Sequence, residues 1–219
     1  MTWGGVRARV ELVARSPRAE FVFGADKHGF RLARPLRERD VTAIEEQFGA
    51  RLPAAYRSFL LEVGACGAGP GYGLLGFRRH RRRWMFGEGD LRGGDRVNLR
   101  PEFAHTEAFL LAEWPDFRTV PGTDRTALAA SLEDRDHAAT HGTLPLSPGD
   151  NGCRDLLVVT GPDRGAVWRD AHALDQALSP YDEIRASRQF DRWYLDWLDG
   201  VEARVGLARR SGGRPGSAW

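Results

Sequence analysis

The chain has 219 residues, of which 42% are hydrophobic and 28% charged, and its formal net charge is +2. This composition is typical of a soluble globular protein whose core needs no metal or disulfide, and the small net charge excludes a globally basic nucleic-acid-binding protein. No stretch approaches the ~20 apolar residues of a membrane-spanning helix and the N-terminus lacks a signal peptide, so we expect a cytoplasmic protein without membrane contact. The two cysteines, Cys66 and Cys153, form no CxxC motif and fit buried thiols in a reducing compartment.

The first 25 residues are expected to form an N-terminal extension of the main domain. They mix charge with short apolar pieces and give a weak strand signal from Val10 to Val13. Segments 20–24 and 26–30 are then predicted to pair as a hairpin that turns near Gly24.

Two short helices joined by a tight bend are predicted next. The apolar residues of segment 41–48 share one helical face, the helix starts near Asp40, and Gly49 is suited to end it. The second helix begins at Pro53, because a missing N–H costs nothing in the first turn, and it ends at Gly64.

Strands and a closing helix dominate the second half of the chain. Segments 155–160 and 166–169 read as two strands of a hairpin, and segment 190–201 keeps strict helical spacing of its aromatic residues. Helices, then strands, then a helix predict a single α+β domain, with an antiparallel or mixed β-sheet flanked by N-terminal helices and a C-terminal helix. The domain is expected to span residues 26–205, followed by a disordered tail at 206–219.

A variable insert is expected at about 77–143, and the glycine-rich loop 67–73 precedes it. The loop lacks the Lys-Ser/Thr pair of a P-loop and follows a helix, whereas phosphate-binding loops follow a strand, so we interpret it as a tight chain reversal. Within the insert, His137 and His141 have metal-ligand spacing but lack the glutamate of HExxH. A solvated charged stretch is favoured there over a metal site.

Catalysis is not expected. Cys153 could act as a nucleophile with Asp150 and with His141 or His172, but a cysteine just before an apolar strand is more often a small buried residue. The aromatic stripe 193–197 predicts core packing in preference to a binding platform.

The arginine run from 78 to 83, followed by Trp84, is the sharpest charge cluster. It could grip phosphates while Trp84 stacks on a base, form a solvated loop, or meet an acidic protein. The near-neutral chain disfavours the nucleic-acid interpretation.

Several motifs stand in a fixed order between about Asp26 and Leu198. They are the helix pair around 44–64, the glycine loop with the segment that follows it, the weaker motif 98–108, the hairpin 149–168 and the closing helix. Together they resemble the SUKH superfamily (Smi/Knr type). The resemblance implies a structural role for the following motif residues: Leu52, Pro53, Tyr56, Phe59, Leu60, Gly69, Gly71, Gly152, Cys153, Gly161, Trp168, Trp193 and Trp197.

The resemblance also implies an α+β fold without catalytic activity, cofactor or metal. Many bacterial relatives neutralise toxins, often nucleases or deaminases, that are encoded beside them, whereas others, including a fungal branch, act as regulatory or scaffold proteins. We therefore expect a non-catalytic protein-binding module, first as an immunity protein against such a toxin. The alternatives are a regulatory or scaffold protein with a non-toxin partner, or an RNA- or DNA-binding protein that uses segment 78–83. The oligomeric state stays open.

An immunity protein needs a rigid surface with buried anchors and steering charges. We expect the concave side of the sheet and the glycine loop to supply the anchors. The candidate partner-binding residues are Tyr72, Arg78, Arg79, Arg81, Arg82, Trp84, Asp191 and Asp196. A surface facing a basic nuclease would instead use the acidic residues near the closing helix: Asp182, Glu183, Asp191, Asp196, Asp199 and Glu202.

Overall fold

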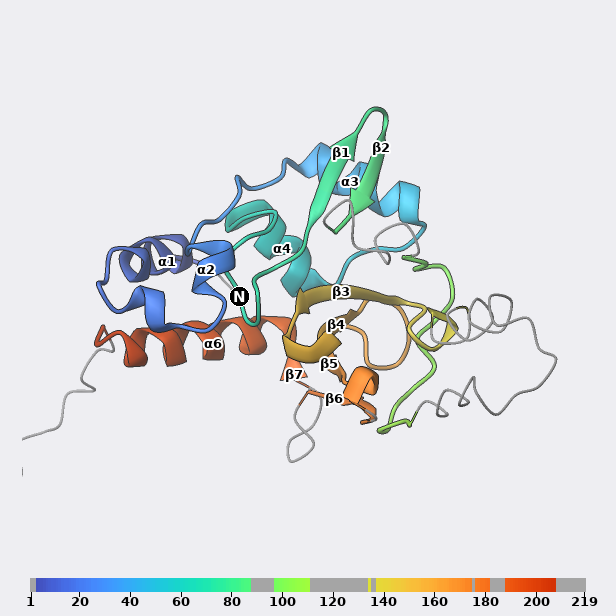
Figure 1. Cartoon of the computed structure of the whole chain (residues 1–219). Helices are drawn as coiled ribbons and strands as arrows, with labels where there is room; N and C mark the ends of the chain where they lie inside the picture. Colours follow the sequence, from blue (N-terminus) through green and yellow to red (C-terminus); the bar gives the residue numbers. More distant parts are fainter. Residues whose placement is uncertain are drawn as a thin grey trace, which may run out of the picture.

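The computed structural model describes residues 3–87, 97–110, 134, 137–174, 176–181 and 188–207. Its α-helices are α1 (Val6–Ala14), α2 (Ala25–His28), α3 (Glu38–Phe48), α4 (Ala54–Glu62) and α6 (Phe190–Arg204). Its strands are β1 (Phe77–His80), β2 (Arg83–Phe86), β3 (Thr143–Pro148), β4 (Arg154–Val158), β5 (Ala166–Asp170), β6 (Leu178–Pro180) and β7 (Arg188–Gln189). In Figure 1 the long helix α6 runs along one side of the molecule, and the β1–β2 hairpin projects on the opposite side, beside α3.

The N-terminal segment is helical, so the strand predicted from Val10 to Val13 is wrong. Val6, Val10 and Val13 are the buried residues of α1, and their spacing by four and three places them on one helical face. They join the main hydrophobic core together with Trp3. Burial against α6 outweighs the weak strand preference of valine, because propensity yields to tertiary packing.

The hairpin predicted over residues 20–30 is also wrong. A 3-10 turn at Ala19–Phe21 and the short helix α2 occupy this region instead. The change of direction does fall at Gly24, which has a φ of 78° at the start of α2.

The helices α3 and α4 confirm the predicted pair. α3 begins at Glu38, slightly before the expected start, and ends at Gly49, whose φ of 71° is the left-handed conformation of a glycine cap. Pro53 directly precedes the first helical residue of α4. The two helices bury Val41, Ile44 and the motif residues of α4 in one core.

The main sheet is antiparallel, with the order β3-β4-β5-β6. The short strand β7 also pairs with β5, at Ala166 and Val167, next to the residues of β5 that pair with β6. Alternate residues of β4 point to opposite faces. Leu157 lies in the core that the helices cover, whereas Leu156 and Val158 pack with Phe103 and Trp168 in a second cluster on the other face. The expected α+β class with an antiparallel sheet is thereby confirmed. Within the described residues, no helix is long and apolar enough to span a membrane.

The aromatic stripe of α6 lies in the core, as its spacing predicted. Trp193 and Tyr194 are buried, and the ring of Tyr194 packs 4.7 Å, centroid to centroid, from Phe59 of α4. The hydroxyl of Tyr194 donates a hydrogen bond of 3.0 Å to the carbonyl of Ala68. This contact ties the glycine loop to the closing helix. Trp197 is half-buried against the same core.

The glycine loop is a tight chain reversal in contact with the neighbouring main chain, as predicted. A Cβ atom at Gly71 would lie 2.4 Å from the carbonyl oxygen of Pro148, and one at Gly69 would lie 2.6 Å from Leu74. The amide of Tyr72 donates to the Pro148 carbonyl at 2.8 Å. Only glycine permits such close approaches. The resulting contacts and the Tyr72–Pro148 hydrogen bond fix the loop against β3.

Two carboxylates face two arginines across β4 and β5 and have opposite pKa shifts. Burial raises the pKa of Asp155 to about 6, and Arg169, 3.3 Å away, opposes this only in part. Burial would also raise the pKa of Asp170, but its hydrogen bond with His172 and the charge of Arg154 at 2.7 Å hold it below the ordinary value.

Replacing these carboxylates by amides is expected to change the pH dependence of stability in opposite directions. Because the folded-state pKa of Asp155 is raised, its stabilising contribution is complete below pH 3.8 and is lost as the pH rises through about 6. The free energy of unfolding of Asp155→Asn, taken relative to that of the wild type, should therefore rise by about 3 kcal/mol between pH 3.5 and pH 7.5. The stability of Asp170→Asn relative to the wild type should fall as the pH rises, by only a small amount over this interval and mostly below pH 3.8, because a lowered pKa stabilises the wild type until the pH falls through the folded-state value. Urea unfolding of the wild type and both variants at the two pH values measures these changes. The same pH dependence of the free energy of unfolding in all three proteins would contradict the prediction.

Candidate protein-binding surface

The arginine run forms a two-stranded antiparallel hairpin, where the sequence indicated only a charged loop. His80 pairs with Arg83, so Arg81 and Arg82 make the turn, and Arg81 has a φ of 53°. All side chains from Arg78 to Arg83 are exposed. The candidate residues Arg78, Arg79, Arg81, Arg82 and Trp84 are thus brought together on one projecting element.

The hairpin is held firmly on α3 by its other side. Phe77 packs against Phe48 of α3 at 5.6 Å and against Phe86 across the strands at 4.8 Å. The side chain of Gln47 accepts from the Trp84 amide at 2.8 Å and donates to the Trp84 carbonyl at 2.7 Å. Trp84 itself is half-buried against the core, so its indole is not the exposed stacking platform considered from the sequence.

The charge of the hairpin is not compensated within the described residues. Arg78 donates to the Gly87 carbonyl at 3.0 Å, and among these residues no ion pair is formed by its four arginine neighbours: Arg79, Arg81, Arg82 and Arg83. Arginines that join parts of the fold behave differently. Arg9 of α1, for example, binds Glu202 of α6 at 2.7 Å and Asp199 at 2.5 Å.

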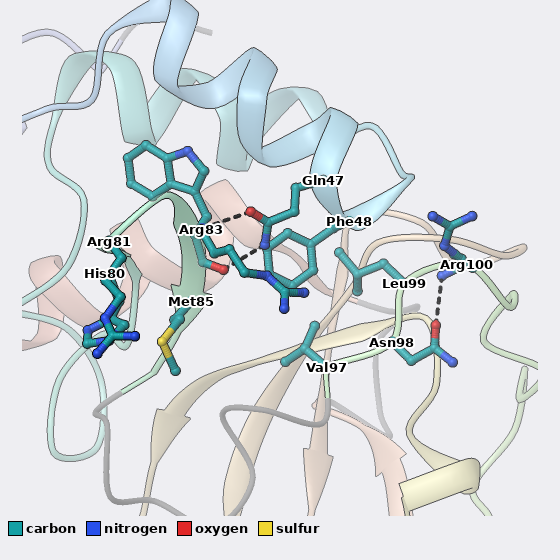
Figure 2. A pocket seen from close by; sticks show the side chains of 11 residues that line it. Gln47, Phe48, His80, Arg81, Arg83, Met85, Val97, Asn98, Leu99 and Arg100 are labelled. Carbon is teal, nitrogen blue, oxygen red and sulfur yellow. Dashed lines mark hydrogen bonds between the residues drawn. The ribbon is translucent and has the colours of Figure 1, made fainter.

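A groove of about 520 Å³ separates the hairpin from segment 97–100. In Figure 2, Met85 on the hairpin and Val97 and Leu99 on the facing segment lie on its two sides. Cationic, polar and apolar side chains line it together; the lining residues are Gln47, Phe48, His80, Arg81, Arg83, Trp84, Met85, Val97, Asn98, Leu99 and Arg100. We call this site the hairpin groove.

The sequence analysis missed the groove, because its apolar lining comes from three separate segments. One signal was present. Alternation across β2 places Arg83 and Met85 on the face opposite Trp84 and Phe86, so the hairpin has one core face and one mixed face. Nothing in the sequence indicates that Val97 lies opposite that mixed face.

A second exposed surface surrounds the candidate residue Tyr72. Its ring lies 5.1 Å from that of Phe23, and its hydroxyl hydrogen-bonds the Asp150 carboxylate, which raises the pKa of the Tyr72 hydroxyl. Phe21 and Phe23 are 81% and 47% exposed. Phe21, Phe23 and Tyr72 form what we call the aromatic patch. The sequence analysis overlooked the two phenylalanines because it placed them in a strand.

The acidic surface proposed on the closing helix is smaller than predicted. Asp191 is only 8% exposed, since it lies in the first turn of α6 on the packed side, so it offers little surface to a partner. Asp196 is exposed, but Asp199 and Glu202 are engaged by Arg9. Asp182 and Glu183 lie outside the described residues. The face of the sheet that the helices do not cover is not an exposed binding surface in the described residues, because Phe103 and Trp168 are buried on it.

The catalytic and metal-binding alternatives gain no support from the geometry. Cys153 is half-buried, and the described residues show no hydrogen bond from it to His172, whose ring is bound to Asp170. Within the described part of the chain, no three His, Cys, Asp or Glu side chains could hold a metal ion. Glu133 and Asp136, near the histidine pair 137/141, lie outside it.

A known protein family matches most of the chain. The model of the SMI1/KNR4 family (SUKH-1) matches residues 35–193, well over half of the chain. No curated protein and no solved structure matches. The matched region runs from the segment before α3 into the first turn of α6, and so it includes the helix pair, the glycine loop, the hairpin and the main sheet. The chain belongs to the SMI1/KNR4 family (SUKH-1).

Proposed function

We propose that this protein is a cytoplasmic immunity protein that binds and neutralises a toxin domain of the nuclease or deaminase class. The observation that carries the proposal is membership in SUKH-1, a family known for immunity and regulatory roles and generally without catalytic activity. A family of this kind points to a protein partner.

The described surface supports binding by a preformed structure. The hairpin is fixed by side-chain to main-chain bonds to Gln47, and the loop that carries Tyr72 is fixed by main-chain contacts to β3. A rigid surface loses little conformational entropy on binding, which favours the high affinity that an inhibitor needs.

The test is co-expression with the toxin encoded by an adjacent gene. We expect the two proteins to co-purify in equal amounts, and cells that express the toxin to survive only when this protein is present. Expression of the toxin without this protein serves as the control. Co-purification with an adjacent non-toxin protein, without any rescue, would overturn the immunity proposal and favour the regulatory or scaffold role.

A further inference from the structure

We propose that the hairpin groove is the part of the surface that binds the partner, and that it takes an extended acidic segment of that protein. Carboxylates of the segment bind Arg81 and Arg83, and one apolar side chain enters between Met85 and Val97. The inference rests on the proposed function, because it names the partner chemistry of the same binding protein.

The first support is charge. Arg81 and Arg83 line the groove, Arg79 and Arg82 stand beside them, and none of these guanidinium groups is ion-paired within the described structure. Arg100 adds a further cation on the facing segment. A guanidinium group binds a carboxylate through two parallel hydrogen bonds, which gives both strength and orientation.

The second support is the kind of apolar side chain in the lining, which favours a polypeptide over a nucleic acid. Single strands are held by exposed aromatic rings on which bases stack. The ring of Phe48 is instead engaged edge to face with Phe77, and Trp84 lies on the face of β2 opposite Arg83 and Met85 and packs against the core. Met85 and Val97 are only partly buried, so they offer aliphatic and thioether surface to an apolar side chain of the partner.

The third support is rigidity. The two bonds between Gln47 and Trp84 and the packing of Phe77 on Phe48 fix the hairpin before any partner arrives. The arginines therefore project from an ordered strand and turn. A preformed set of cations also accelerates association with an acidic surface.

This chemistry has a consequence for the mode of neutralisation. An inhibitor that imitates nucleic acid presents carboxylates to a basic active site, whereas the hairpin groove presents guanidinium groups. The partner is therefore bound through an acidic surface, and a nuclease partner is bound elsewhere than along its basic substrate cleft.

Fluorescence anisotropy with synthetic probes tests the partner chemistry. The main probe is a fluorescein-labelled twelve-residue peptide of Asp and Glu with two central leucines; the others replace the leucines by glutamine or the acidic residues by lysine. A 20-nucleotide RNA and a 20-base-pair DNA duplex represent nucleic acid. We expect the acidic leucine peptide to bind best, and to weaken at least tenfold between 50 and 300 mM NaCl because surface charges are screened. Tighter binding of RNA or DNA, or no binding of that peptide at 1 mM, would overturn the inference.

The hairpin variant is Arg81→Glu with Arg83→Glu, and its matched control is Arg34→Glu with Arg192→Glu, two exposed arginines outside the groove that give the same change in net charge. We expect the hairpin variant to bind the acidic leucine peptide at least tenfold more weakly than the wild type, and the control to bind less than threefold more weakly. Met85→Ala should weaken binding of the leucine peptide but not that of the glutamine peptide. Circular dichroism checks that each variant is folded. Equal losses in both arginine variants would refute a specific site.

The adjacent-gene toxin separates this inference from the proposed function. If the toxin is captured equally well by the hairpin variant, the groove is not the interface, although the immunity function stands; loss of capture in Phe23→Ala with Tyr72→Ala would then assign the interface to the aromatic patch. If no toxin is neutralised while the peptide results hold, the immunity function fails and the groove remains an acidic-segment site.

Discussion

Replacing Trp3 by alanine is expected to lower the free energy of unfolding by about 3–5 kcal/mol, the usual cost of removing a buried tryptophan. The side chain is only 5% exposed although it lies near the start of the chain. Its ring packs edge to face on Phe59 at 5.2 Å and on Tyr194 at 6.2 Å, and its indole N–H donates to the Ser58 hydroxyl at 2.8 Å. The substitution removes contacts with α4 and α6 together.

Leu12→Ala provides the control for this experiment. Leu12 belongs to α1 but is 49% exposed, so its removal should change stability by less than about 1 kcal/mol. Urea unfolding followed by far-ultraviolet circular dichroism measures both variants. Similar small effects for the two would mean that the N-terminal segment does not unfold together with the domain.

The region before α3 shows where prediction from the sequence failed. The expected extension with a strand is a helix that contributes Val6, Val10 and Val13 to the core. Its buried residues follow helical spacing. Charged residues interrupt them, however, so the apolar pieces are short and resemble a strand. Contacts with distant helices stabilise the helix: Arg9 forms ion pairs with α6, and Trp3 packs on both α4 and α6. The family match begins at residue 35, so this segment lies outside it.

The elements with strong periodicity were predictable, because their burial follows from local spacing. The helix pair, the β4–β5 hairpin and α6 are of this kind, and the motif residues Tyr56, Phe59 and Trp193 are buried as expected. The candidate site was predictable only in its charge. Arg78 to Arg83 stand out in any reading of the sequence, but the groove needs Phe48 and Val97, which come from different segments. Contacts between distant segments depend on tertiary structure and leave no local pattern.

The glycine at position 24 illustrates such a tertiary constraint, and Gly24→Ala is expected to lower the free energy of unfolding by about 2–5 kcal/mol. Gly24 precedes α2 with a φ of 78°, where a Cβ atom costs about 1–2 kcal/mol. That atom would also lie 2.0 Å from the carbonyl oxygen of Gly71, in the loop that carries Tyr72. Relieving the overlap moves one main chain against another and adds roughly 1–3 kcal/mol.

Gly5→Ala separates the two costs. Gly5 precedes α1 with nearly the same φ, 79°, but nothing lies within 4 Å of its Cβ position. We expect this variant to lose only the conformational part, about 1–2 kcal/mol. The difference between the two variants in urea unfolding then measures the close approach of residue 24 to the glycine loop. Because that approach orders the aromatic patch, Gly24→Ala should also increase hydrogen exchange at the amide of Tyr72, whereas Gly5→Ala should leave it unchanged; equal losses of stability would show that the contact between the two loops contributes nothing.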